Sequence, residues 1–276
     1  TAVWREKPQN KGGHWPVNVI HTSVGNEAPL FVDVDGDGRK DIVGNDPEKK
    51  QIIWLQSPQK KGDTAWTLTV IAAGDDIPGT HMYTHGLGYA DINSDGRKDV
   101  LISKGWWEGP SDPKQPNWTF HATDLSADCA QMYVMDLNDD GLADILSSSA
   151  HNYGIWWQEQ QKDAGGNITF KHHHIDSSFS QSHSLALVDV NGDGHPDLVT
   201  GKRYFAHNGG DPGAHEPAVL YWFEYKPGKT PVWIKHEVDN DSGSGLNLVV
   251  EDINGDKLPD IIVSNKKGVH VFLQKK

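Results

Sequence analysis

Five short acidic segments share one pattern, D-x-[DN]-x-D-G-x-x-D, and they recur along the whole chain. Successive segments begin 45 to 63 residues apart, and the last one has a lysine in place of the glycine. Their first residues are Asp33, Asp91, Asp136, Asp189 and Asp252. A repeat of this length is typical of solenoids, propellers and other arrays, in which copies of one supersecondary unit stack on each other.

The residues that flank each acidic segment are apolar and follow the spacing of short strands. Leu30-Phe31-Val32 precedes the first segment, and Ile42-Val43 follows it. Because these runs are short, rich in β-branched residues and bounded by turn residues, each repeat is predicted to contain two strands joined by an acidic loop.

Two further elements recur in each repeat after a variable loop. The third element is an aromatic residue or pair followed by Gln or Glu: Trp54-Leu55-Gln56, Trp106-Trp107-Glu108, Trp156-Trp157-Gln158, Trp222-Phe223-Glu224 and Phe272-Leu273-Gln274. The fourth element starts with an aromatic residue and alternates, over residues 66–71, 118–123, 170–175 and 233–238. Each repeat is therefore predicted to be a four-stranded blade.

The fifth repeat lacks a fourth strand because the sequence ends at Lys276, but residues 15–20 fit the same alternating pattern. A ring closes if this N-terminal segment supplies the missing strand, whereas a linear solenoid would not need a displaced strand. The sequence therefore predicts an all-β, five-bladed β-propeller, formed by residues 1–276 as a single domain, whose last blade is closed by the N-terminal strand.

The acidic loops are predicted to bind calcium. Carboxylates and an Asn carbonyl at alternate positions converge on one centre, the glycine permits the sharp turn, and hard oxygen ligands suit Ca²⁺. The predicted ligands occupy positions one, three, five and nine of the loops: Asp33, Asp35, Asp37, Asp41, Asp91, Asn93, Asp95, Asp99, Asp136, Asn138, Asp140, Asp144, Asp189, Asn191, Asp193, Asp197, Asp252, Asn254, Asp256 and Asp260. Four or five structural calcium ions are expected, because Lys257 must adopt the conformation of glycine in the fifth loop. The alternative is a set of Asx-rich turns without metal.

The composition of the chain restricts the partners that it can bind and the compartment in which we expect it. The chain has 38 acidic and 25 basic residues and a formal net charge of −13, which argues against nucleic acid as a partner. No apolar run is long enough for a membrane-spanning helix, and Cys129 is the only cysteine, so no internal disulfide forms. Calcium loops need micromolar to millimolar calcium, so we expect export to the periplasm or outside a bacterial cell. The start at Thr1 fits a processed exported protein, and no pattern indicates an oligomeric state.

The repeats resemble FG-GAP/VCBS repeats, which form calcium-bearing β-propellers in exported adhesion modules, lectins and lyases. Three segments, 81–86, 104–108 and 201–207, also resemble the propeller of aldos-2-ulose dehydratases and related bacterial keto-sugar lyases. That resemblance implies elimination on a keto-sugar with a divalent metal. Those enzymes have a larger propeller and added cupin domains, neither of which this sequence matches.

Candidate site residues come from positions where the blades differ, since a function on a repeat scaffold breaks the repeat. Residues at the start of each innermost strand are expected at the mouth of a central channel, away from the calcium loops. The predicted catalytic residues are His81, His85, Lys104, His151, His183, Lys202 and Tyr204. The predicted substrate-binding residues are Glu27, Tyr83, Trp107, Gln131, His207 and Asn247.

A catalytic Zn²⁺ or Mn²⁺ is predicted on His85, Gln131 and His183, because imidazole suits these ions. The alternative is that the histidines only form hydrogen bonds in a wet channel. For Trp107 the alternative is packing within its blade. Residues 204–217 are predicted to be a lid, or else an irregular surface loop.

The leading function is a carbohydrate-active lyase that eliminates water or an alkoxide from a sugar bearing a carbonyl, with a metal as electrophile and a His or Lys as base. One alternative is a lectin or adhesion propeller without catalysis. A second alternative is a glycoside hydrolase, which would need two or three carboxylates at the mouth, where only Glu27 and Asp46 fit.

Overall fold

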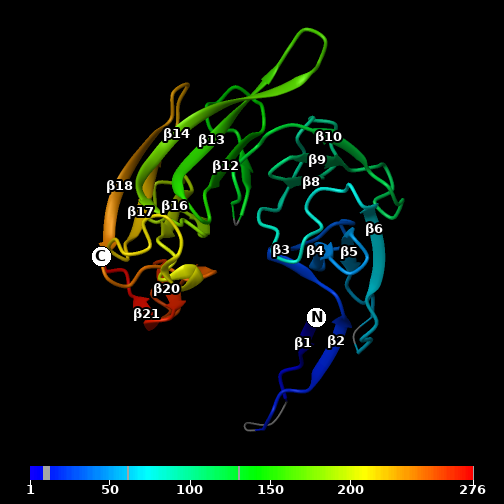
Figure 1. Ribbon diagram of the computed structural model, residues 1–276, viewed down its shortest axis with the longest axis horizontal. Coiled ribbons are helices and arrows are strands. Elements are labelled where there is room, and N and C mark those ends of the chain that lie inside the picture. The colour runs from blue at the N-terminus through cyan, green and yellow to red at the C-terminus, as the bar shows by residue number, and fades with distance from the viewer. Residues whose placement is uncertain (9–12, 61, 130, 276) are drawn as a thin grey trace. The chain divides into compact units, whose positions relative to one another are not determined.

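The computed structural model describes residues 1–8, 13–60, 62–129 and 131–275, and nearly all of its regular structure is β-strand (Figure 1). The chain divides into two compact units, which are described separately. The first unit is Thr1–Ala90 with Gly96–Ala122, and the second is Asp91–Asp95 with Thr123–Lys276. The predicted extent of a single domain therefore stays a prediction.

The first unit contains two four-stranded antiparallel sheets, each with its strands in chain order. The first sheet is β3 (Gly25–Val32), β4 (Asp41–Asp46), β5 (Gln51–Gln56) and β6 (Thr67–Ala73). The second is β7 (Gly88–Ala90), β8 (Asp99–Ile102), β9 (Gly105–Glu108) and β10 (Thr119–Ala122). A separate hairpin pairs β1 (Ala2–Arg5) with β2 (Val17–His21).

The second unit contains three further antiparallel sheets and one short 3₁₀ helix, η1 (Ala206–Gly209). Two sheets are four-stranded: β11 (Tyr133–Met135), β12 (Asp144–Ser148), β13 (Tyr153–Lys162) and β14 (Ile168–Ser180), then β15 (Ser184–Val188), β16 (Asp197–Gly201), β17 (Leu220–Lys226) and β18 (Val232–Asp239). The last is three-stranded: β19 (Leu248–Glu251), β20 (Asp260–Asn265) and β21 (Gly268–Phe272). The long strands β13 and β14 extend as a hairpin beyond the rest of their sheet (Figure 1).

In three blades the second strand is buried on both faces, which is why these residues form interior strands. Every residue of β8, β12 and β16 is buried, as expected for a strand covered on both sides. In the first unit Trp54, Val100 and Trp107 belong to one core cluster that joins its two sheets. In the second unit Leu146, Leu198 and Phe223 belong to another.

Five sheets in simple up-and-down order confirm the prediction of an all-β, five-bladed propeller chain. Residues 17–21 pair with β1 along one edge, and the sheet that contains β21 has three strands among the described residues. The predicted closure would join the first unit to the second, and it stays a prediction. The repeat pattern missed Ala2–Arg5, which alternates in exposure and is the hairpin partner of β2.

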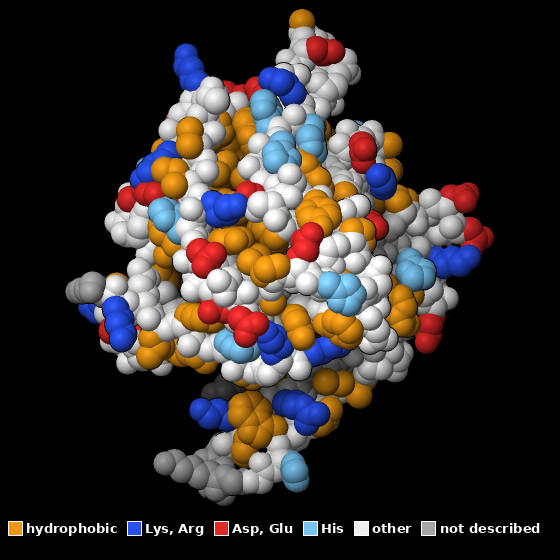
Figure 2. Space-filling view, turned by 60° about the vertical axis from the view of Figure 1, so that its left-hand side comes forward, with side chains coloured by type: hydrophobic (Ala, Val, Ile, Leu, Met, Phe, Trp, Pro, Cys, Tyr) orange, Lys and Arg blue, Asp and Glu red, His pale blue; other side chains and the backbone are white. Residues whose placement is uncertain are grey.

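The described residues include no helix with the length and apolar character to cross a membrane. On the face shown in Figure 2, lysine and arginine side chains are interspersed with acidic and histidine side chains.

Candidate functional site

The acidic loops share one set of backbone hydrogen bonds, and these bonds shape the turn. In the first loop the amides of Gly36 and Asp37 donate to Oδ1 of Asp33 at 2.8 and 3.2 Å, and the amide of Gly38 donates to Oδ2 at 2.8 Å. The loops that begin at Asp189 and Asp252 repeat all three bonds. The first aspartate therefore fixes the conformation of the turn through hydrogen bonds to the backbone of its own loop.

The carboxylates of the first loop fit a hard cation. One oxygen each from Asp33, Asp35 and Asp37 lies within 4.8 Å of the others. The Asp35 side chain is 10 % exposed, and its Oδ1 is buried with no hydrogen-bond partner among the described residues. Burial, then the negative charges of Asp37 and Asp41, raise the pKa of Asp35. A buried, unpaired carboxylate oxygen beside like charges is the environment that a calcium ion stabilises.

The lysine of the fifth loop adopts the backbone conformation expected from the repeat. Lys257 has φ 69°, against 84° and 90° for Gly141 and Gly194 at the same position. Its amide donates to Oδ2 of Asp252 at 2.9 Å, as the glycine amides do to their own first aspartates. The fifth loop therefore keeps the turn geometry at the cost of a left-handed lysine.

The aspartate at position nine ties each loop to the third strand. In the third blade the Asp144 carboxylate is fully buried; it accepts the amide of Leu137 at 2.9 Å and the amide of Gln160 at 2.8 Å. Asp41, Asp197 and Asp260 make the same pair of contacts in their blades. Because carboxylate oxygens have several lone pairs, these bonds still allow a contact to a cation.

This anchor corrects the alignment of the third strands. Asp99 accepts the amide of Gly109, the residue after Glu108, so Glu159, which precedes Gln160, is the counterpart of Glu108 in the third blade. Trp157 is therefore the counterpart of Trp106, and the predicted alignment of Trp156 with Trp106 is wrong by one residue.

Three blades consequently carry the same histidine–tryptophan–glutamate contact. His121 stacks on Trp106 with ring centroids 4.0 Å apart, and its Nε2 lies 2.9 Å from Oε2 of Glu108. In the next two blades His173 contacts Trp157 and Glu159, and His236 contacts Trp222 and Glu224. The three histidines lie at equivalent positions of the outer strands β10, β14 and β18.

In the first unit the structure pairs Glu27 with His85, whose Nε2 lies 3.3 Å from Oε2 of Glu27. His85 is 7 % exposed. His81 and Tyr83 are exposed, with ring centroids 5.7 Å apart. Lys104 is exposed in the turn between β8 and β9.

The prediction for Trp107 needs a correction. Its side chain is 1 % exposed, belongs to the core of the first unit, and lies against Phe120 at 4.9 Å between ring centroids. Stacking of Trp107 on a sugar is therefore wrong, because no face of the ring is accessible, and packing within the blade is its role.

In the second unit three histidines and one aspartate gather at the insertion of the fourth blade, residues 204–217, which itself carries His207 and Asp211. Nδ1 of His207 lies 2.9 Å from Oδ1 of Asp211, and Nδ1 of His151 lies 3.4 Å from Oδ2 of the same carboxylate. The rings of His151 and His207 are 4.9 Å apart, and buried His183 meets His151 edge-on at 6.2 Å. The sequence predicted all three histidines but missed Asp211, whose only signal was its place four residues after His207 in an acidic insertion.

Burial and hydrogen bonding act in opposite directions on Asp211. Burial raises the pKa of its carboxyl group, but hydrogen bonds from His207 and then His151 outweigh that effect and hold the pKa below its usual value. The carboxylate is therefore held in its charged form between two imidazoles.

The insertion that carries His207 and Asp211 has a strained backbone and close packing. Phe205, His207 and Asn208 all have positive φ, from 46° to 56°, a conformation that costs energy for residues other than glycine. Gly213, at φ +70°, approaches so closely that a Cβ would lie 2.5 Å from Oη of Tyr153. The insertion therefore combines a strained backbone with close packing of Gly213 against Tyr153.

Lys202 holds the backbone of this insertion through hydrogen bonds. Its side chain is fully buried, and its ammonium group donates to the carbonyl of Glu216 at 2.9 Å and to the carbonyl of Gly213. Burial lowers the pKa of Lys202, and the charge of Glu216 offsets part of this effect. Two of the three N–H groups of the ammonium hold the backbone of the insertion, which gives Lys202 a positioning role, and its predicted catalytic role stays a prediction.

The remaining predicted residues of the second unit lie around these groups. The amide of Tyr204 donates to the carbonyl of Ser244 at 3.1 Å. Nε2 of Gln131 lies 3.4 Å from Oδ1 of Asn247, while Oε1 accepts the amide of Leu185.

The three predicted metal ligands are divided between the units. His85 belongs to the first unit, whereas Gln131 and His183 belong to the second. A metal held by all three stays a prediction.

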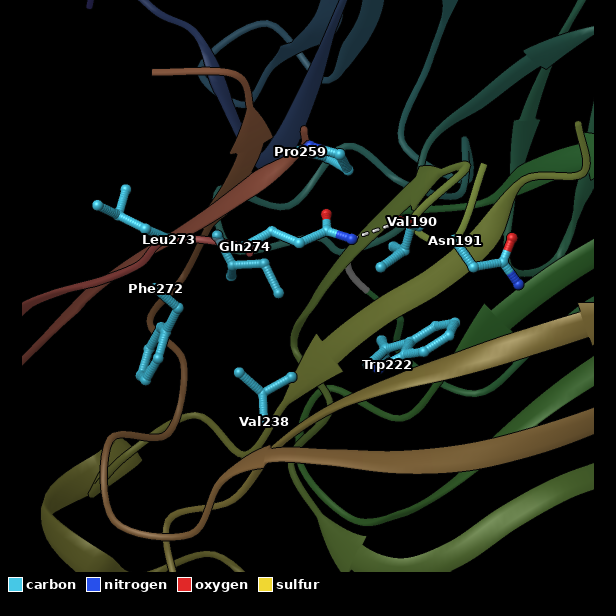
Figure 3. Close-up of a pocket in the computed structure, with 9 residues that line it drawn as sticks. Val190, Asn191, Trp222, Val238, Pro259, Phe272, Leu273 and Gln274 are labelled. Atoms are coloured by element: carbon cyan, nitrogen blue, oxygen red, sulfur yellow. Dashed lines mark hydrogen bonds between the residues drawn. The ribbon is translucent and has the colours of Figure 1, made fainter. Parts of the chain in front are cut away.

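A separate apolar pocket opens between the last two sheets of the second unit (Figure 3). Val190, Trp222, Val238 and Phe272 line it, and Gln274 crosses one side by donating to the carbonyl of Val190 at 2.9 Å. Its lining has no ionisable side chain, so it offers apolar contact but no group for proton transfer.

The blades and their acidic loops define a β-propeller of the FG-GAP type, and sequence comparison agrees. Residues 33–102 and 136–200 match the sequence model described as an FG-GAP-like repeat. The chain therefore contains FG-GAP-like repeats, the repeat unit of FG-GAP/VCBS propellers. No curated protein matches the chain in sequence.

Solved structures give weaker likenesses. The crystal structure of the V. cholerae biofilm matrix protein Bap1 is 16 % identical, with a TM-score of 0.43 over 81 % of this chain and 30 % of the Bap1 chain. A chain from a cryo-EM structure of RAG in complex with one melted and one unmelted RSS is 10 % identical, with a TM-score of 0.43 over 92 % of this chain and 83 % of its own. This chain thus spans under a third of the Bap1 chain, and neither likeness bears on function.

Proposed function

We propose that the chain is an exported, calcium-stabilised propeller that acts as a carbohydrate lyase, and that its chemistry takes place at the histidine cluster of the second unit. The observation that carries the proposal is the cluster of three imidazole rings, in which His151 contacts both His183 and His207. His207 lies in the insertion whose backbone the buried Lys202 holds. Neutral imidazole is a common general base near pH 7. Blades that only stack on each other do not need such a group.

The reaction that fits is elimination from a sugar that bears a carbonyl group. The base takes the proton from the carbon next to the carbonyl, and the freed electron pair forms a carbon–carbon double bond. The carbon–oxygen bond on the next carbon breaks, and the leaving oxygen departs with a proton as water or an alcohol. A bound divalent cation would supply positive charge for the carbonyl oxygen.

His183 is the imidazole best suited to be the base. Its Nδ1 lies 3.1 Å from the carbonyl of Leu246, an arrangement that puts the proton on Nδ1 and the lone pair on Nε2. Because His183 is buried, proton transfer takes place directly within the cluster or through one water molecule. The imidazolium that forms then protonates the leaving oxygen, which balances the reaction.

The test is incubation of the full, calcium-loaded chain with 3-keto-glucosides and uronic-acid oligosaccharides, with product followed by the absorbance of the conjugated carbonyl. We expect turnover by the natural sequence, a loss of at least 100-fold in His183→Gln, and no loss in His174→Gln, a matched change on an exposed strand residue. Turnover that survives in His183→Gln contradicts the assignment of the base, and no turnover on any keto-sugar contradicts the lyase proposal.

The second candidate is carbohydrate binding without catalysis. One observation favours it, namely the same histidine–glutamate pair on the outer strands of three blades, since lectin propellers repeat their sites. Binding of about three equivalent glycans per chain, without turnover, would support it over the lyase. A glycoside hydrolase is favoured less, because the histidine cluster contains one carboxylate, Asp211.

A further inference from the structure

We propose that His151, His207 and Asp211 form the binding site of one divalent transition-metal ion. One ligand atom from each of these side chains lies within 4.8 Å of the other two. Two imidazole nitrogens and one carboxylate oxygen are a ligand set that suits Zn²⁺, Mn²⁺ or Co²⁺, and three protein ligands leave positions open for water or a sugar oxygen.

The three side chains differ in exposure to solvent, from the nearly buried Asp211 to the exposed His207. The side chains of Asp211, His151 and His207 are 13 %, 27 % and 52 % exposed. A metal at their centre would be held from the protein side by the carboxylate and would face solvent beside His207. This is the geometry of an open site rather than of a closed structural one.

The backbone of the insertion is strained at and next to the proposed ligand His207. His207 itself has φ 46°, and its neighbours Phe205 and Asn208 are also left-handed. Such strain persists only where surrounding contacts over-determine the conformation, and it concentrates at binding sites. Here Lys202 supplies the contact, because it fixes the carbonyls of Gly213 and Glu216 beyond Asp211.

The histidine–aspartate contacts also have an explanation without metal, in which each imidazole donates an Nδ1 proton to Asp211. The two explanations differ in a measurable way. A hydrogen-bonded cluster has no affinity for Co²⁺ beyond that of exposed histidines, whereas a metal site binds one ion per chain and gives it a defined ligand field.

The inference deepens the proposed function, since it names the ligands of the cation that the elimination uses, and it leaves His183 outside the ligand set as the base. Metal binding is measured without any sugar. A chain that binds metal but does not turn over keto-sugars therefore counts against the lyase and not against the metal site.

The experiment titrates the full chain with Co²⁺ in excess Ca²⁺, so that the acidic loops are filled, and records calorimetry and the visible spectrum. We expect one Co²⁺ per chain and absorption bands of a histidine-ligated ion. His207→Ala and Asp211→Asn should each weaken binding at least tenfold. His215→Ala, in the same insertion but against the ring of Phe205, should bind within twofold of the natural sequence, and melting curves should show that all variants fold.

Three results would overturn the proposal. The first is an absence of Co²⁺ binding once calcium is present. The second is binding by His207→Ala and Asp211→Asn that equals binding by the natural sequence. The third is a loss in His215→Ala as large as that in His207→Ala, which would show that the shape of the insertion, and not ligation, is being measured.

Discussion

The buried ammonium group of Lys202 donates a hydrogen bond to the backbone carbonyl of Glu216 at 2.9 Å, and it also donates to the carbonyl of Gly213. Met has a similar length but no donor, so Lys202→Met leaves both carbonyls without this partner. An unsatisfied buried polar group costs about 1–3 kcal/mol, and the partly exposed insertion can relax, so we expect a loss of about 2 kcal/mol in the free energy of unfolding.

The same variant should open the insertion to protease. Limited proteolysis followed by mass spectrometry should show faster cleavage within residues 204–217 than in the natural sequence, while Lys229→Met, a change at an exposed position, should leave cleavage unchanged. Equal cleavage rates in Lys202→Met and the natural sequence would mean that Lys202 does not hold the insertion.

Removal of calcium should lower the melting temperature. A ligand that binds only the folded state adds about 2.7 kcal/mol per site at 100 times its Kd, so loss of several filled loops is a large change for a domain of this size. Differential scanning fluorimetry with EDTA and then with excess Ca²⁺ measures it, and Mg²⁺ should restore less because it prefers small octahedral sites. An unchanged melting temperature in EDTA would favour the alternative of metal-free Asx turns.

Stability without calcium should depend on pH because of the buried acids at position nine. Burial is the largest cause that raises the pKa of Asp144, to about 6 from its usual 3.8. A raised folded pKa favours the protonated form, so its stabilisation is present below about pH 4 and is lost as the pH rises through 6. In EDTA the chain should be more stable at pH 5 than at pH 7.5, by on the order of 1–3 kcal/mol, and saturating calcium should remove that advantage. A free energy of unfolding in EDTA that increases from pH 5 to pH 7.5 would contradict this role of Asp144.

The blades and acidic loops could be predicted from sequence because their signals are local. Asp252 and Lys257, for example, take the positions that the repeat gives them. The choice between Trp156 and Trp157 could not be made locally, because two adjacent tryptophans fit the pattern equally well and a hydrogen bond from Gln160 to Asp144 decides it. Asp211 was missed because its partner His151 lies 60 residues away, and only the folded insertion brings them together.

The left-handed lysine of the fifth loop should be replaceable with a gain in stability. Lys257 has φ 69°, which costs about 1–2 kcal/mol for a residue with a side chain, while glycine loses more backbone entropy on folding. We therefore expect Lys257→Gly to stabilise the chain by up to about 1 kcal/mol and to strengthen calcium binding at this loop by removal of a positive charge. Chemical denaturation with and without calcium measures both, and a destabilised variant would contradict the strain argument.

Replacement of the position-nine acid should damage the blade more than replacement of a loop ligand. In Asp144→Asn one carbonyl oxygen remains for the amides of Leu137 and Gln160, and the new NH₂ group faces a donor. We expect a loss of about 2–3 kcal/mol, because a buried amide is left unsatisfied. Asp140→Asn, at an exposed loop position, is the matched control and should cost little when calcium is absent. Similar losses in both variants under EDTA would show that the strand anchor is not the cause.

The contact between His173 and Glu159 in the third blade should make the free energy of unfolding depend on pH in the acidic range. The hydrogen bond from His173, at 2.6 Å, is the largest cause that lowers the pKa of Glu159. A lowered folded pKa contributes stability that is present above the usual carboxyl value of about 4.3 and is lost as the pH falls through the folded value. His173→Gln should therefore raise the pKa of Glu159 and cost under about 1 kcal/mol at pH 6, as for a partly exposed pair, with little effect at pH 3. Carboxyl NMR titration of Glu159 in both proteins is the direct measurement, and an unchanged pKa in His173→Gln would show that the histidine stacks on Trp157 without engaging the carboxylate.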